Sequence, residues 1–170
     1  MSISIKSQDI LILLYLLTKP EGWLQSEVAE SLLISPAEVS NALNRCVVSG
    51  LINGDKSRVN KLALREFLIG GLKYAFPAEV SAKVRGIATA HSASPIKEKI
   101  AEGEDIYVWS HYLGTRRGFG VKPLYKTVPK IAEKNPALYE LLVIADTLRI
   151  GKVREVEIAI EELDKRLNNV

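Results

Sequence analysis

The chain has 170 residues, of which 47% are hydrophobic and 25% are charged, and its net charge at pH 7 is +3. This composition is typical of a soluble globular protein with enough apolar residues for one core or two small ones. The longest apolar run, residues 10–17, is too short to span a bilayer, and no signal-peptide pattern opens the chain. We therefore expect a cytoplasmic protein that does not enter membranes. The single cysteine, Cys46, excludes an intrachain disulfide and a multi-cysteine zinc site.

The charges are unevenly distributed. Basic residues exceed acidic ones by four in residues 39–65 and by five in residues 106–134, whereas acidic residues exceed basic ones by two in residues 135–170. Basic segments permit binding of nucleic acid, although clusters of solvated surface charge are also common. The distribution predicts that different parts of the chain have different tasks.

Three helices are predicted in the N-terminal part, at residues 7–18, 25–33 and 35–50. The third carries the strongest signals, because Ser35 is suited to the N-cap, Pro36 to the first helical position, and Glu38 to a reciprocal capping box. Gly50 provides the left-handed turn that ends such helices. The first helix is apolar almost all round, so we expect it near the centre of a small domain.

Two short strands, residues 51–52 and 58–62, are predicted on either side of the turn "NGDKS" at residues 53–57. A fourth helix is expected at residues 63–75, with a kink or close packing at the pair Gly70 and Gly71 because glycine weakens a helix. Residues 1–76 are thus predicted to form one domain.

The stretch "GIATAHSASP", residues 86–95, is small, polar and poor in large apolar residues, and residues 77–104 around it are predicted to be a linker or a loosely structured connection. Residues 105–170 are expected to form an α+β domain for effector sensing, partner binding or dimerisation. Its predicted elements are a hairpin of strands 105–113 and 121–125 with a turn at residues 115–120, then helices at 128–133, 136–150 and 153–167. The last two helices are expected to pack as a helical hairpin. The fold class is therefore mainly α with a small β component.

No combination of residues predicts catalysis. His91 and His111 are far apart in sequence and lack cysteine or carboxylate partners at metal-ligand spacing. We interpret His91 as a surface-loop residue and His111 as a packed or surface residue. Cys46 lies on the apolar face of the third helix and is interpreted as a small core residue. We expect no enzymatic activity, no cofactor and no metal.

The stretch "QSEVAESLLISPAEVSNALNRCVVSGLI", residues 25–52, resembles the winged helix-turn-helix of bacterial transcriptional regulators, MarR-like ones among them. In it "VAESL" is similar to the positioning helix, "SPAEVSNAL" to the start of the recognition helix, and "SGLI" to the step into the wing. The resemblance covers residues 5–76 only. One departure is Leu33, which occupies the turn position where such proteins often carry glycine, so the turn between these helices is expected to differ.

The resemblance implies that the third helix lies in the major groove of double-stranded DNA. With its apolar residues turned inward, Asn41 and Asn44 are expected to contact adenine, and Arg45 a guanine or a phosphate. Short hydroxyls and the wing cations are expected to reach the phosphate backbone. The DNA-contacting residues expected in this way are Ser35, Ser40, Asn41, Asn44, Arg45, Lys56 and Arg58.

A second candidate site is the aromatic and basic stretch at residues 107–126, in which Trp109, Arg116 and Arg117 could bind an effector or nucleic acid. Alternating aromatic residues more often face a core while the basic residues between them are solvated. Both interpretations stay open at this point.

The sequence favours a DNA-binding transcriptional regulator that acts as a homodimer, with the first helix or the C-terminal helical hairpin as the interface. The alternative is an antitoxin-like or other protein-interaction partner of a toxin or defence enzyme, which would bind DNA only to regulate its own synthesis.

Overall fold

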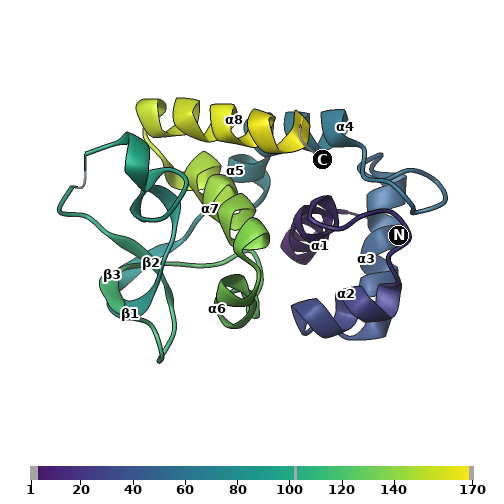
Figure 1. Cartoon of the computed structure of the whole chain (residues 1–170), viewed down its shortest axis with the longest axis horizontal. Helices are drawn as coiled ribbons and strands as arrows, with labels where there is room; N and C mark the ends of the chain where they lie inside the picture. The colour runs from purple at the N-terminus through teal and green to yellow at the C-terminus, as the bar shows by residue number, and fades with distance from the viewer. Residues whose placement is uncertain (1–3, 102, 169–170) are drawn as a thin grey trace.

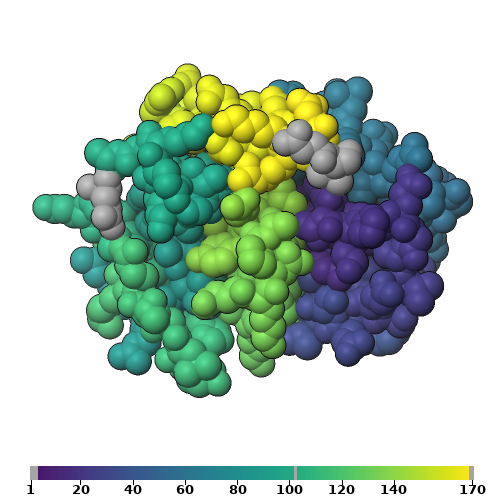
Figure 2. Space-filling view, viewed as in Figure 1, coloured from purple at the N-terminus to yellow at the C-terminus, as the bar shows by residue number. Residues whose placement is uncertain are grey.

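The structure is a computed structural model that describes residues 4–101 and 103–168. It is mainly helical, with one small three-stranded sheet. Helices from the N-terminal part and the sheet lie at opposite ends of the molecule, and α7 (Pro136–Ile150) lies between them (Figure 1). In the space-filling view the two ends and α7 form one continuous body (Figure 2).

The N-terminal helices are α1 (Ser7–Leu17), α2 (Gln25–Leu32) and α3 (Pro36–Val48), which confirm the predicted helices to within two residues. Both α1 and α2 pack against α3. The predicted strands after α3 are reduced to one antiparallel bridge between Ile52 and Val59. The predicted fourth helix is divided into α4 (Lys61–Gly70) and α5 (Leu72–Ala75), so the break expected at the glycine pair is confirmed.

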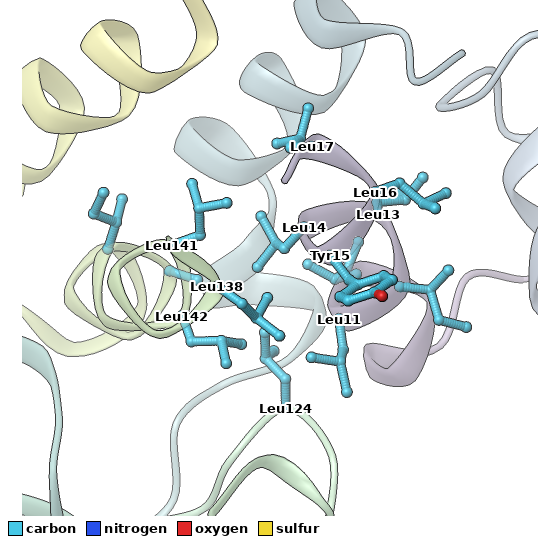
Figure 3. Packing of buried hydrophobic residues seen from close by; sticks show 14 of the residues in the cluster. Leu11, Leu13, Leu14, Tyr15, Leu16, Leu17, Leu124, Leu138, Leu141 and Leu142 are labelled. Carbon is cyan, nitrogen blue, oxygen red and sulfur yellow. The ribbon is translucent and has the colours of Figure 1, made fainter. Parts of the chain in front are cut away.

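Helix α1 is the centre of the core. Its residues from Ile10 to Leu17 are all buried, because α3 packs on one side of the helix and α7 on another. Figure 3 shows α1 beside α7, with Leu14 of α1 turned toward Leu138 and Leu141 of α7. The expectation that α1 could form a dimer interface is therefore wrong, since its apolar surface is already covered within the chain.

The sheet is a closed barrel of three strands, β1 (Val80–Ala88), β2 (Tyr107–Ser110) and β3 (Arg116–Val121). Strand β1 pairs antiparallel with both other strands, whereas β2 and β3 are parallel. Two predictions are corrected by this arrangement. Residues 77–104 are not a linker, because they include β1, which pairs with both other strands. Residues 105–125 are not a hairpin, because the predicted turn at 115–120 is mostly strand β3.

Backbone segments of the barrel approach each other so closely that glycine is required at some positions. A Cβ atom at Gly86 would lie 1.9 Å from the carbonyl oxygen of Trp109, and one at Gly118 would lie 2.3 Å from that of Ile106. These distances are far below van der Waals contact, so the strands could not approach as they do with any side chain at either position. The glycines of "RRGFG" therefore allow the strands to close, which sequence spacing alone does not indicate.

The remaining elements connect the barrel to the helices. They are the 3₁₀ turns η1 (Ala90–Ser92), η2 (Lys97–Lys99) and η3 (Ala132–Lys134), the short helix α6 (Val128–Ile131), and α8 (Val153–Asn168). Helices α7 and α8 pack together as the predicted helical hairpin. Across the described residues, no helix is both long and apolar enough to cross a membrane.

Helix α8 also links the two ends of the molecule. Asp164 on α8 accepts two hydrogen bonds from Arg65 of α4, at 2.6 and 3.1 Å. At the barrel side, Glu162 pairs with Lys99 of η2 at 2.7 Å and with Arg166 at 2.7 Å. These cations hold the pKa of Glu162 at about 2, although burial acts in the opposite direction. Because the hydrophobic cluster is also continuous from α1 to α8, the two ends share one core.

Candidate nucleic-acid interface

The exposed side of α3 is an uncharged stripe. Ala37, Asn41, Asn44 and Val48 are exposed and lie at intervals of three and four residues, so they follow one another along the helix surface. Ser40 is half-buried beside them. Asn41 and Asn44 are therefore placed outward as predicted, with their amide groups available to a partner.

At the N-terminus of α3, only one of the two hydrogen bonds of a capping box is formed. The Ser35 hydroxyl oxygen accepts a hydrogen bond of 3.2 Å from the Glu38 backbone N–H, as predicted. The Glu38 carboxylate accepts instead from the Gln8 side-chain amide of α1, at 2.9 Å. The expected capping box is thus half formed, because Glu38 connects α3 to α1 rather than closing back on Ser35.

Arg45 does not face outward, and its predicted orientation is wrong. Its guanidinium donates two hydrogen bonds of 2.8 Å to the carboxylate of Asp9 on α1, and these side chains are 13% and 0% exposed respectively. The bidentate bond to the carboxylate raises the pKa of Arg45. Among the described residues no other cation pairs with Asp9, which also accepts a 2.9 Å bond from the Lys6 backbone N–H, so a contact between Arg45 and DNA would leave a buried carboxylate without its ion-pair partner. Sequence reasoning missed this pair because the two residues are 36 positions apart.

The turn between α2 and α3 has the left-handed backbone conformation that is typical of glycine. Leu33 has φ 55° and ψ 43°, which is the left-handed region, and its side chain is 52% exposed. The expectation of a different turn at this position is therefore wrong. A leucine adopts the conformation at a cost in backbone strain, because its Cβ approaches the following carbonyl oxygen.

The turn at residues 53–57 is ordered by its own side chains. The Asn53 side-chain oxygen accepts from the backbone N–H groups of Ser57 and Arg58, each at 2.9 Å. Asp55 accepts from the Ser57 hydroxyl at 2.6 Å, and such bonds lower the pKa of Asp55. Lys56 takes a left-handed φ of 62° and is half-buried, while Arg58 is exposed.

The cations near α3 are few. Helices α2 and α3 carry the carboxylates Glu27, Glu30 and Glu38 but a single cation, Arg45, which Asp9 already pairs. Arg58 donates a bond of 2.7 Å to Glu21, and both side chains are more than 70% exposed. Such an exposed pair is weak and can open for a phosphate. The positive charge available next to α3 therefore comes from Lys56 and Arg58 rather than from the helix.

The second candidate site is not assembled as predicted. Trp109 is 1% exposed, and its indole N–H donates a hydrogen bond of 2.7 Å to the Asp146 carboxylate. The same carboxylate accepts hydrogen bonds from Thr89 at 2.7 Å and from Arg149 at 2.9 Å. Burial raises the pKa of Asp146, although these donors act against it. Trp109 is therefore a core residue that fixes β2 to α7. Nothing in the local sequence marks Asp146, because it lies within an apolar helix.

Arg116 and Arg117 are consecutive residues on β3, so their side chains leave opposite faces of the strand. Arg116 pairs in register with Gly86 and is half-buried, whereas Arg117 pairs with Arg85 and is exposed. The predicted group of Trp109, Arg116 and Arg117 is thus separated into three different environments.

Cys46 and His91, whose side chains could in principle take part in chemistry, are both held within the fold. Burial raises the pKa of the Cys46 thiol to about 12, which keeps it protonated and confirms its interpretation as a core residue. His91 is half-buried, with Nε2 2.8 Å from the Asp105 carbonyl oxygen and Nδ1 3.9 Å from Glu155. Its placement in a flexible surface loop is therefore wrong. Within residues 4–101 and 103–168, no three His, Cys, Asp or Glu side chains are grouped as metal ligands.

The fold and this geometry define a mainly helical protein with a small β-barrel and an uncharged helical face, followed by a turn that carries Lys56 and is flanked by Arg58. Comparison of the chain with models of protein families, with curated proteins and with solved structures gave no match.

Proposed function

We propose that residues 5–76 form a winged helix-turn-helix that binds double-stranded DNA, and that the chain is a transcriptional regulator acting as a homodimer. In this assignment α3 is the recognition helix and residues 53–57 are the tip of the wing. The observation that carries the proposal is the exposed stripe of α3, whose outward polar groups are the amides of Asn41 and Asn44. An asparagine amide forms two hydrogen bonds with adenine in the major groove.

The geometry changes which residues are expected to read DNA. Arg45 supports the helix from within, so base contacts come from Asn41 and Asn44. Ser35 and Ser40 are at the N-terminal part of α3, where short hydroxyls and backbone N–H groups suit phosphate oxygens. Lys56 and Arg58 supply the cationic contacts. With two cations per copy, the logarithm of affinity should fall with the logarithm of salt concentration with a slope of about −2 per copy.

The proposal is tested by fluorescence polarisation with labelled duplex DNA at low salt. Asn41→Ala with Asn44→Ala should weaken binding at least tenfold to A·T-containing duplexes and reduce the preference for them, because each bidentate contact discriminates between bases. Folding should be unaffected, since alanine favours the helix at exposed positions. The control pair Ser110→Ala with Thr115→Ala removes exposed hydroxyls at the barrel and should bind like wild type. Equal affinity of both double variants would overturn the proposal.

A second candidate function is an antitoxin-like protein-interaction module. It is favoured by the pairing of Arg45 with Asp9 and by the carboxylates of α2, which leave the α2–α3 surface poor in free cations. In that case the chain would form a stoichiometric complex with a protein partner, and DNA binding would serve only autoregulation. Co-purification with the product of a neighbouring gene, together with a loss of complex in Asn41→Ala with Asn44→Ala, would favour this function.

A further inference from the structure

One side of the β-barrel carries an unexplained group of cations and aromatic rings. Strand register places Lys83 opposite Phe119 and Arg85 opposite Arg117 between β1 and β3, and Tyr107 opposite Phe119 between β2 and β3. Residues that are directly opposite in register point to the same side of a sheet. We call these five residues the basic face.

The basic face is accessible and its charges are not neutralised. Lys83, Arg85 and Arg117 are exposed, and Phe119 and Tyr107 are half-buried. Within the part of the chain that the structure describes, no carboxylate pairs with Arg85 or Arg117. Like charges directly opposite one another destabilise a pair of strands, so folding alone gives no reason for two facing arginines.

The rings are arranged next to the cations. The Lys83 ammonium lies 5.4 Å from the centroid of the Phe119 ring, and the Phe119 and Tyr107 rings are 6.4 Å apart. Beyond Tyr107 lies His91, at a ring separation of 4.9 Å. Burial, and then the charges of Asp105 and Glu155, raise the pKa of Tyr107 at this edge of the basic face. These two carboxylates act on Tyr107, whereas the three cations of the basic face lie on β1 and β3.

We propose that the basic face binds a single-stranded nucleic acid. The three cations suit consecutive phosphates, and the partly exposed rings give unpaired bases a surface on which to stack. A duplex offers phosphates but keeps its bases stacked within the helix, so the aromatic part of the face would remain unused. The face lies at the end of the molecule opposite α3 (Figure 1), so it is independent of the proposed DNA-binding helix.

The test uses a fluorescein-labelled dodecauridylate and the full-length protein, by fluorescence polarisation at several salt concentrations. The triple variant Lys83→Ala, Arg85→Ala, Arg117→Ala should lose at least tenfold in affinity at low salt, and its salt slope should be smaller by about 2. A matched variant, Lys73→Ala, Lys130→Ala, Lys134→Ala, removes the same charge from exposed positions elsewhere. Equal affinities of the two triple variants would overturn the proposal.

A second variant separates base stacking from simple charge attraction. Phe119→Leu keeps an apolar side chain but removes the ring, and it should weaken dodecauridylate binding about fivefold with an unchanged salt slope. Circular dichroism of each variant establishes that it is folded. If Phe119→Leu binds like wild type and polyglutamate displaces the RNA, the face is a site for an acidic protein and the proposal is wrong.

The result can be distinguished from failure of the winged-helix proposal. Asn41→Ala with Asn44→Ala should retain dodecauridylate binding, and the basic-face variant should retain binding to duplex DNA. A single variant that abolished binding of both probes would contradict the separation of the two surfaces.

Discussion

Arg45 has a structural role that depends on one contact with a residue distant in sequence. On α3 alone it is a cation on a surface helix, but in the folded chain its guanidinium satisfies the carboxylate of Asp9 on α1. A charge as buried as Asp9 is costly unless it is paired, so this contact joins α1 to α3 and fixes how α3 is presented.

We expect Arg45→Ala to lower the free energy of unfolding by about 3–5 kcal/mol, because the Asp9 carboxylate would stay buried without its partner. Arg58→Ala removes an arginine from an exposed ion pair and should cost less than about 1 kcal/mol. Urea denaturation measures both. If the two variants unfolded at the same urea concentration, the structural role of Arg45 would be refuted, and loss of DNA binding in Arg45→Ala could be attributed to a direct contact.

Leu33 has the left-handed backbone conformation that glycine adopts most easily. Leu33→Gly should stabilise the protein by about 1 kcal/mol, because glycine adopts a left-handed φ without strain. Leu62→Gly removes a leucine of α4 that is also exposed and should destabilise the protein by about 1 kcal/mol, since its position is helical. If the strain at Leu33 is real, the midpoint of thermal unfolding rises in Leu33→Gly and falls in Leu62→Gly. If it is not, both midpoints shift in the same direction.

At the scale of elements, the helices follow from local signals whereas the barrel does not. The caps Ser35 and Asn135 and the proline after each of them define the starts of α3 and α7, and the structure begins both helices where predicted. The barrel depends on contacts between distant segments. The end of β1 overlaps the small polar stretch at residues 86–95 that resembles a loop, and Gly118 and Gly120 resemble a turn until β1 is placed beside them.

The barrel makes a prediction about Gly86. Gly86→Ala should destabilise the protein by about 3 kcal/mol, because the added methyl group would overlap the backbone of β2 at Trp109. Gly54→Ala places a methyl group where no atom lies within 4 Å and should change stability by less than about 0.5 kcal/mol. A thermal scan that gave both variants the same midpoint would mean that the strands are not as closely packed as the structure has them.

In the whole molecule, the two domains predicted from the sequence share one hydrophobic core. The segment expected to separate two domains is part of the barrel, and the core is continuous from α1 through α7 to α8. Sequence patterns identify which residues are apolar, but they do not show that α1 is shared between α3 and α7, because an all-round apolar helix fits a small or a large core equally well.

A shared core predicts one cooperative unfolding transition. In Trp23→Phe the remaining indole, Trp109, reports on the barrel, while far-ultraviolet circular dichroism reports on the helices of both ends. The two signals should change at the same urea concentration, as in a two-state protein. Two separate midpoints would indicate independent domains joined by a linker.

Photo-crosslinking shows directly whether the exposed stripe of α3 lies against double-stranded DNA. A photoreactive side chain is introduced at position 44 on α3 or at position 157, an exposed position on α8, and each protein is irradiated with labelled duplex DNA at low salt. Our prediction is that position 44 forms crosslinks and position 157 forms none. Equal yields from the two positions, or crosslinks from position 157 alone, would contradict it.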